Sequence, residues 1–522
     1  MFNKCALLVA LAISVASAVD ATPTHAQDKV IVEGVGTNPP HFNRLLTTDI
    51  ATMVIGGTIF ETLVRLDAKY TIMPALATAW SSNPEATEYR LTLRDGVKWH
   101  DGKPFTADDV VFTFKSFVPL SPAAAGFARF VEDVSSPDPK TVVIKFNKPF
   151  APFLEALAGL WIMPQHAYAD PKNVATDPVN SKPIGTGPFK FESFKSGDRA
   201  VVVRNDNYWG ARTDIESIVF PILPDANSRA LAFESGDIQY SYGSYIDKSA
   251  WKRLLSDNRF GAMRERGHVL TVTAHVNTTR GPMAKYEVRK AVFQAIDRKA
   301  IGDRAYFGFA APARGPVPSE MSWAAGNEVD FRKDLPFDPV AAAKLLDEAG
   351  YPRPANGTRF SLDLAYPAEF SSLAAAAGVI QSNLGELGIK VNLIAEDSQV
   401  WRDRTYKAHN YDISMIFYTT FEDPSLGVTR AYICNKENMV YRNASGLCDE
   451  ALDADFAAAG ATTNRDERRA AFTRAEKRIE GLLHTYPIVV EQQFYFGRKD
   501  LWDMEQAHAT HPVDWSLVKA RK

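Results

Sequence analysis

Cysteine is scarce in this 522-residue chain, and its acidic and basic residues nearly cancel. It has three cysteines, 59 lysines and arginines, and 62 aspartates and glutamates, so its net charge is −3. This near-balance argues against a nucleic-acid-binding protein, which usually carries a basic excess. After the first apolar run, no later run reaches the ~18–20 residues that a membrane-spanning helix needs. The apolar fraction of 46% allows a sizeable core, and this length predicts about three domains or two large lobes.

The signatures of common enzyme classes are also absent from the sequence. It has no HExxH pair, no GxSxG elbow, no GxxxxGK(S/T) phosphate loop and no CxxC motif. The histidines after residue 26 are scattered, and no two lie four positions apart, as metal ligands on one helix face would. The sequence therefore predicts no catalytic residue, no metal site and no cofactor.

Residues 1–26 have the pattern of a secretory signal peptide. Lys4 precedes an apolar run over residues 5–19, and Thr24-His25-Ala26 is a small-residue cleavage site. Ala16-Ser17-Ala18 is a second candidate cleavage site, and an uncleaved membrane anchor is the alternative. We therefore expect the mature chain to start at residue 27 and to work outside the cytoplasm.

Two cysteines, Cys434 and Cys448, belong to the expected mature chain. In an oxidising compartment, an even pair of this spacing indicates one disulfide that closes a small loop. Such a loop would add roughly 3 kcal/mol of stability in the chain-entropy model. A pair of free buried thiols is the alternative.

Strand and helix patterns alternate along the whole sequence, which predicts an α/β fold. Residues 89–94 alternate apolar and polar side chains, as a half-buried strand does, and Thr106 can cap a short helix after it. Residues 360–365 and 389–394 read as strands on either side of an alanine-rich helix. This strand–helix–strand order predicts parallel pairing with a right-handed crossover.

One stretch of the chain carries a family signature. Residues 79–114 read AWSSNPEATEYRLTLRDGVKWHDGKPFTADDVVFTF. This stretch closely resembles the family 5 extracellular solute-binding proteins, which serve ABC importers for peptides, nickel and opines. Further blocks resemble the family in the same order, so that the resemblance covers nearly the whole mature chain: 59–67, 74–77, 185–189, 204–209, 277–301, 341–352 and 411–414.

The resemblance implies a monomeric, periplasmic receptor of the two-lobed binding-protein fold. Lobe one would hold residues 27–275, with a small extra subdomain, and residues 486–522. Lobe two would hold residues 276–485, and two crossover strands would run near 268–277 and 487–497. Such lobes close around a ligand by a hinge motion. The receptor would then deliver its solute to an ABC permease in the inner membrane. An extracytoplasmic enzyme or chaperone on the same scaffold, or a chemoreceptor adaptor, is the alternative.

The family's usual peptide anchors are missing at the matching positions. Peptide-binding members commonly place an aspartate where this chain has Thr420 or Phe421, and Glu422 could substitute for it. Dipeptide-binding members place an arginine where this chain has residues 366–369, Tyr-Pro-Ala-Glu. A buried amine or carboxylate without a partner is costly. The ligand class therefore stays open among longer peptides, opine- or sugar-derived compounds and other polar solutes.

The remaining candidate ligand contacts come from three places in the sequence. Trp401, Arg404 and Tyr406 precede the strand at 411–418, where family members often present an aromatic wall. Arg430 follows the cleft loop and could meet an anionic group. Asn38 follows the first strand. For each of them, a packing or surface position is the alternative.

Overall fold

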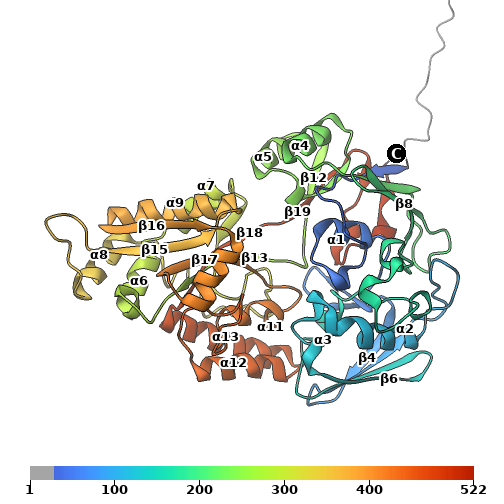
Figure 1. The fold of residues 1–522 in the computed structure, drawn as a ribbon, viewed down its shortest axis with the longest axis horizontal. Coiled ribbons are helices and arrows are strands. Elements are labelled where there is room, and N and C mark those ends of the chain that lie inside the picture. Colours follow the sequence, from blue (N-terminus) through green and yellow to red (C-terminus); the bar gives the residue numbers. More distant parts are fainter. Residues whose placement is uncertain (1–28, 522) are drawn as a thin grey trace, which may run out of the picture.

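The computed structural model describes residues 29–521 of the chain. The expected signal peptide lies outside the described residues. Figure 1 shows two lobes side by side, one built around a large sheet and the other from several smaller sheets. The α/β, two-lobed fold that the sequence predicts is therefore confirmed. No helix among residues 29–521 is long and apolar enough to cross a membrane.

Lobe two is built on a six-stranded mixed sheet in the order β14–β18–β13–β17–β15–β16. Strands β15 and β16 are parallel and are joined through α9, as the strand–helix–strand pattern predicts. The central strands β13 and β18 are buried almost throughout, because helices cover both faces of the sheet (Figure 1). The strands are β13 (Leu270–Val276), β14 (Ala310–Pro312), β15 (Phe360–Pro367), β16 (Ile389–Glu396), β17 (Ile413–Thr419) and β18 (Thr485–Glu491).

The helices of lobe two pack in pairs: α7 against α9, α6 against α8, and α12 against α13. Figure 1 shows α7 and α9 on one side of the sheet and α6, α12 and α13 on the other. They are α6 (Tyr286–Gln294), α7 (Arg298–Ala305), α8 (Pro339–Glu348), α9 (Ser371–Glu386), α10 (Ser398–Arg402), α11 (Pro424–Gly427), α12 (Glu450–Ala461) and α13 (Arg465–Leu482).

Lobe one contains the strands of the family signature in an antiparallel sheet, β4–β5–β7–β6. Strand β5 alternates buried and exposed side chains, as expected. Helix α2 starts with a capping box between Thr106 and Asp109, as the sequence predicts. Trp99 donates a hydrogen bond from Nε1 to Asp109 at 3.1 Å, and His100 bonds to Gly187 O at 3.0 Å. These signature residues hold the subdomain together.

The other sheets of lobe one are β1–β10–β9–β8, β11–β19–β12, β21–β2–β3 and β20–β22. The strands are β1 (Val30–Val32), β2 (Val64–Asp67), β3 (Ile72–Pro74), β4 (Ala77–Ser82), β5 (Glu88–Leu93), β6 (Val131–Asp138), β7 (Thr141–Phe146), β8 (Phe189–Lys195), β9 (Arg199–Arg204), β10 (Ser217–Pro221), β11 (Tyr240–Tyr242), β12 (Phe260–Arg264), β19 (Phe494–Arg498), β20 (Trp502–Asp503), β21 (Thr510–His511) and β22 (Lys519–Ala520). The helices are α1 (Ile50–Gly56), α2 (Ala107–Phe112), α3 (Phe153–Leu157), α4 (Ala226–Ser235) and α5 (Lys248–Ser256).

Two short segments connect the lobes. Residues 265–269 lead from β12 to β13, and residues 492–493 lead from β18 to β19. The two segments touch, because Glu265 N donates a hydrogen bond to Gln493 O at 2.9 Å. Since β13 and β18 lie wholly within the large sheet, the strand bounds favour lobe boundaries at these two segments rather than at 275 and 485.

Candidate ligand-binding cleft

A cavity of about 810 Å³ lies between the two lobes. Residues 122–130 and 148–156 of lobe one form one wall, and residues 421–442 and 453–461 of lobe two form the other. Pockets that bury a small molecule typically measure about 300–1,000 Å³. The cavity is therefore large enough for an organic solute that contacts both lobes.

Most of the cavity wall is apolar. In lobe one, the ring of Phe150 lies 5.8 Å from that of Phe127 and 6.1 Å from that of Phe130. Lobe two contributes aliphatic and aromatic side chains from α11, α12 and the loop between them: Leu426, Ile433, Met439, Val440 and Phe456. A bound solute would lose water from its apolar parts against both walls.

Four positive side chains, here called the cationic rim, also line the cavity: Arg129, Lys148, Arg430 and Arg442. None of them forms an ion pair with any residue that the structure describes. Burial, together with the charge of Arg129, lowers the pKa of Lys148. Burial lowers the pKa of Arg442, and the charges of Arg129 and Arg430 lower it further, whereas the charge of Glu437 partly offsets them. The rim therefore contains positive charges from both lobes that act on one another.

Arg430, an expected anion contact, lies in the lobe-two wall beside Phe421 and Glu422. Its Cζ atom is 5.3 Å from the ring centre of Tyr418 and 5.6 Å from that of Phe421. Its Nε atom is buried and has no hydrogen-bond partner among the described residues. Burial lowers the pKa of Arg430. The rings fix the position of a guanidinium that has unused donors.

Glu422 is one of the two acidic residues that line the cavity, and it belongs to a buried group of charges, here called the inner cluster. His511 Nε2 lies 3.3 Å from Glu422, and its Nδ1 lies 3.5 Å from Glu265. His268 Nδ1 also lies 3.5 Å from Glu265. Burial alone would raise the pKa of Glu422, but the hydrogen bond and charge of His511, with His268 and Arg44, hold it below its usual range.

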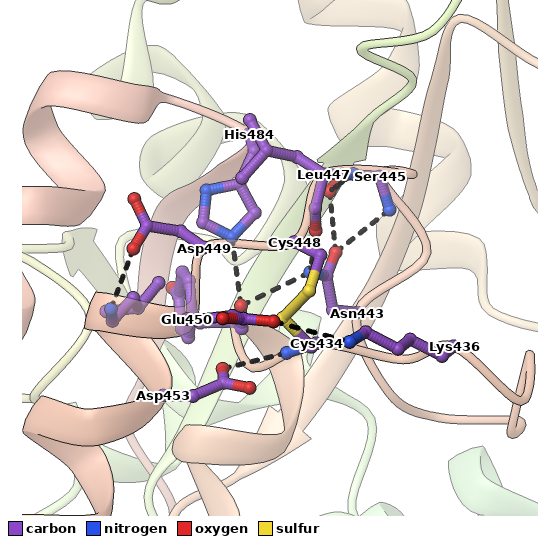
Figure 2. Close-up of a disulfide and its surroundings, with 12 residues drawn as sticks. Cys434, Lys436, Asn443, Ser445, Leu447, Cys448, Asp449, Glu450, Asp453 and His484 are labelled. Carbon is purple, nitrogen blue, oxygen red and sulfur yellow. Dashed lines mark hydrogen bonds and ion pairs between the residues drawn. A yellow bond between two sulfur atoms is a disulfide. The ribbon is translucent and has the colours of Figure 1, made fainter.

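The second acidic residue, Asp453, is held by the backbone. Its Oδ1 accepts a hydrogen bond from Cys434 N at 2.9 Å (Figure 2). It also lies in the first turn of α12, where the helix dipole stabilises a carboxylate. Both acidic groups of the cavity thus have favourable partners, whereas none of the four cations forms an ion pair with a residue among 29–521.

Three further expected contacts lie behind the cavity wall. Thr420 is buried and donates from Oγ1 to Val269 O at 3.2 Å. Trp401 is fully buried, and its Nε1 donates to Ser414 Oγ at 3.0 Å. The rings of Trp401 and Tyr406 lie 6.3 and 6.2 Å from that of Tyr441, which lines the cavity. Trp401 and Tyr406 thus pack behind Tyr441. Direct ligand contact stays a prediction for Thr420, Trp401 and Tyr406.

Arg404 and Asn38 lie away from the cavity. The Arg404 guanidinium pairs with Glu396, with nitrogen–oxygen distances of 2.8 and 2.6 Å. Asn38 is exposed, and its Oδ1 accepts a hydrogen bond from Gly197 N at 2.7 Å in the turn between β8 and β9. For these two residues as well, ligand contact stays a prediction.

The sequence did not identify Arg129, Lys148, Tyr441 or Arg442 as candidates. Arg129 lies in a single 3-10 turn over Ala128–Phe130, and the other three lie in loops, where a charged or aromatic residue is ordinarily solvent-exposed. The one local signal is the run FARF at residues 127–130, which places an arginine between aromatic side chains.

The Cys434–Cys448 disulfide is present, as the sequence predicts (Figure 2). It closes a loop that presents residues 439–442 to the cavity. Inside the loop, the side chain of Asn443 donates to Leu447 O at 3.0 Å and accepts from Ser445 N at 2.9 Å. The disulfide and this hydrogen-bonded turn together fix the loop that forms part of the cleft wall.

Comparison with known proteins identifies the family. Residues 71–438, more than half of the chain, match the bacterial extracellular solute-binding proteins, family 5 Middle. The chain belongs to this family. Family 5 members bind solutes rather than transform them, and the resemblance seen in residues 79–114 is confirmed.

Its relatives include proteins named for different ligands. Heme-binding protein A of Haemophilus influenzae is 29% identical over 430 residues, covering 78% of this chain and 76% of that protein. The nickel-binding periplasmic protein of Escherichia coli K12 is 26% identical over 479 residues, covering 89% and 90%. The structure of the ABC transporter substrate-binding protein CtaP from Listeria monocytogenes superposes with a TM-score of 0.81 at 23% identity, covering 94% and 99%. This chain is thus an extracellular solute-binding protein whose fold matches that structure.

Proposed function

We propose that this family 5 protein is a monomeric periplasmic receptor that binds one solute in the cleft and delivers it, unchanged, to an inner-membrane ABC permease. The observation that carries the proposal is the cavity of about 810 Å³ whose walls come from both lobes. A solute that touches both walls stabilises the closed arrangement over the open one. The lobes would move about residues 265–269 and 492–493, the two segments that join them.

Contacts between the lobes at the edge of the cavity support this closing motion. Ala151 N in lobe one donates a hydrogen bond to Gly460 O in lobe two at 2.8 Å. Glu155 of α3 lies 3.7 Å from Arg465 and 3.9 Å from Arg468 of α13. Opening the cleft would break these few polar contacts, which a bound solute would reinforce.

The proposal can be tested on the mature chain, residues 27–522. We would denature the purified protein, identify the released small molecules by mass spectrometry, and return each one to refolded protein. We expect one compound to bind with 1:1 stoichiometry in calorimetry and to reduce the radius of gyration in X-ray scattering.

A second measurement addresses transport. Deleting the gene in its own host is expected to abolish uptake of that compound, and the wild-type gene is expected to restore it. Binding without compaction would contradict hinge closure. Conversion of the compound into a product by the purified protein would instead favour the enzyme alternative.

A further inference from the structure

The charges of the cleft do not balance. Four cations line it, and the two acidic residues, Glu422 and Asp453, are already engaged by His511 and by a backbone N–H group. Arg129 and Lys148 lie over the ring of Phe130, with Cζ and Nζ at 4.7 and 3.6 Å from its centre. A ring face attracts a cation but does not neutralise it. The cavity therefore has a net positive lining.

The positive charges come from opposite walls, so they affect closure. Arg129 belongs to lobe one and Arg442 to lobe two, and the Arg129 charge contributes to the lowered pKa of Arg442. Like charges that approach in a cavity of reduced dielectric constant repel one another. An anion between them would turn this repulsion into attraction for both lobes.

The apolar wall restricts what the anion can be. The loop closed by the disulfide leaves Met439, Val440 and Tyr441 exposed at 39%, 39% and 40% of their surfaces, although all three line the cavity. Across from them lie Phe127, Phe130 and Phe150. Clustered hydrophobic side chains exposed at a cleft mark a surface that binds apolar groups. A small hydrated anion would leave this surface uncovered.

We propose that the cleft takes an organic anion with an apolar body, whose acidic groups meet Arg430 and Arg442 of one lobe and Arg129 and Lys148 of the other. This inference deepens the proposed receptor function and rests on it. The ligand carries at least two acidic groups, because each lobe contributes two cations without an ionic partner among the described residues. Charge selects the solute, and the aromatic and aliphatic wall binds its body.

The test uses three small probes in calorimetry: naphthalene-2,6-dicarboxylate, its neutral analogue 2,6-bis(hydroxymethyl)naphthalene, and succinate. The first has both charge and an apolar body, and each of the others lacks one of these. We expect the naphthalene dicarboxylate to bind about tenfold more tightly than either analogue, since losing even one charged hydrogen bond or the apolar contact weakens binding by at least this factor. Its affinity should fall as salt is raised, because salt screens charges. Equal affinity for the neutral analogue, or no binding of any probe at millimolar concentration, would overturn the inference.

Matched variants locate the interaction. Arg430→Gln with Arg442→Gln should weaken the naphthalene dicarboxylate about tenfold or more and leave the neutral analogue unchanged. The control is Arg304→Gln with Lys344→Gln, which removes the same charge from exposed positions on α7 and α8 outside the cavity. Thermal unfolding of both variants checks that each is folded. If the rim variant and the control bind alike, the inference is wrong.

Two further outcomes separate this inference from the receptor function. A neutral compound that is released from the protein, rebinds and compacts it would keep the receptor function and overturn the anion inference. The opposite result is tight binding of the naphthalene dicarboxylate without compaction, together with unchanged uptake of the released compound after deletion of the gene. It would keep the anion inference and overturn the receptor function. Arg129→Gln with Lys148→Gln should reduce both the affinity and the compaction, because these two cations connect the anion to lobe one.

Discussion

The cationic rim and the inner cluster lie at the same cleft but use charge in opposite ways. In the inner cluster, His511 lies within 3.5 Å of both Glu265 and Glu422, and His268 lies 3.5 Å from Glu265. In the rim, four cations have no ionic partner among residues 29–521. Paired buried charges hold the lobes and their connections to one another, whereas unpaired charges at a cavity are available to a solute. We therefore attribute a stabilising role to the inner cluster and ligand recognition to the cationic rim.

The largest effect should come from a buried ion pair next to the inner cluster. Both oxygens of Asp423 lie 2.8 Å from Arg468 Nη2, and both residues are almost fully buried. Asp423→Asn would remove the nearer carboxylate and leave Glu155, at 3.9 Å, as the remaining acidic group beside the buried Arg468. Breaking a buried pair in this way typically costs about 3–5 kcal/mol. We expect a loss of this size in the free energy of unfolding, measured by urea denaturation.

An exposed pair provides the matched control for that variant. Asp403 pairs with Lys407 at 2.7 Å, with both side chains about half exposed or more. Asp403→Asn should change the free energy of unfolding far less, because water screens an exposed pair. Equal losses for the two variants would show that burial does not distinguish paired charges here.

Removing the disulfide should have the next largest effect. Cys434→Ser with Cys448→Ser frees a loop of 14 residues, which corresponds to about 3 kcal/mol in the chain-entropy model. Because this loop carries residues 439–442 into the cleft wall, we also expect weaker binding of the naphthalene dicarboxylate. The oxidised and reduced wild-type proteins, compared in thermal unfolding and calorimetry, should show the same two losses. Unchanged binding of the naphthalene dicarboxylate after reduction of the disulfide would show that closing this loop does not contribute to ligand binding.

The inner cluster should make stability depend on pH. Burial opposes ionisation of Glu265, but His268 and His511 lower its pKa to about 2, from an ordinary value of 4.5. A carboxylate with a depressed pKa stabilises the fold above 4.5, and this contribution is lost as the pH falls through about 2. Glu265 raises the pKa of His268 against the effect of burial. That contribution is present below 6.5 and is lost as the pH rises through the raised pKa of His268.

We expect the wild type to lose about 2 kcal/mol more stability than Glu265→Gln when the pH falls from 5 to 3. Urea denaturation at both pH values measures this difference. Glu85→Gln, at an exposed position, is the control and should follow the wild type. An identical pH response of Glu265→Gln and wild type would show that the inner cluster does not contribute to the pH dependence of stability.

The fold was more predictable than the site because its signals are local. The alternation in residues 89–94, the cap at Thr106 and the strand–helix–strand order at 360–394 each specify structure over a few positions, and each is confirmed. The Cys434–Cys448 pair needed only its spacing and the expected compartment. Segments of this kind form wherever the pattern occurs.

The cleft could be predicted only in part, because its lining residues come from segments of both lobes that are far apart in the sequence. Phe421, Glu422 and Arg430 line the cavity, and their contact with a ligand stays a prediction. Arg129 and Arg442 face one cavity although 313 positions separate them in the sequence. No periodicity distinguishes such a cation from an ordinary surface residue. Burial of Trp401 and Tyr406 likewise depends on the packing of the segment that carries Tyr441.

The smallest expected effect distinguishes a supporting residue from a ligand contact. Trp401→Phe removes the donor to Ser414 Oγ and leaves a small void, which should cost about 1–2 kcal/mol of stability. If Trp401 acts only behind Tyr441, its substitution should change the affinity for the naphthalene dicarboxylate less than threefold. Tyr441→Ala, at a position that is 40% exposed, should do the opposite and weaken binding with little loss of stability. A greater loss of affinity in Trp401→Phe than in Tyr441→Ala would mean that Trp401 reaches the solute, as the sequence predicts, and that the cleft rearranges when it binds.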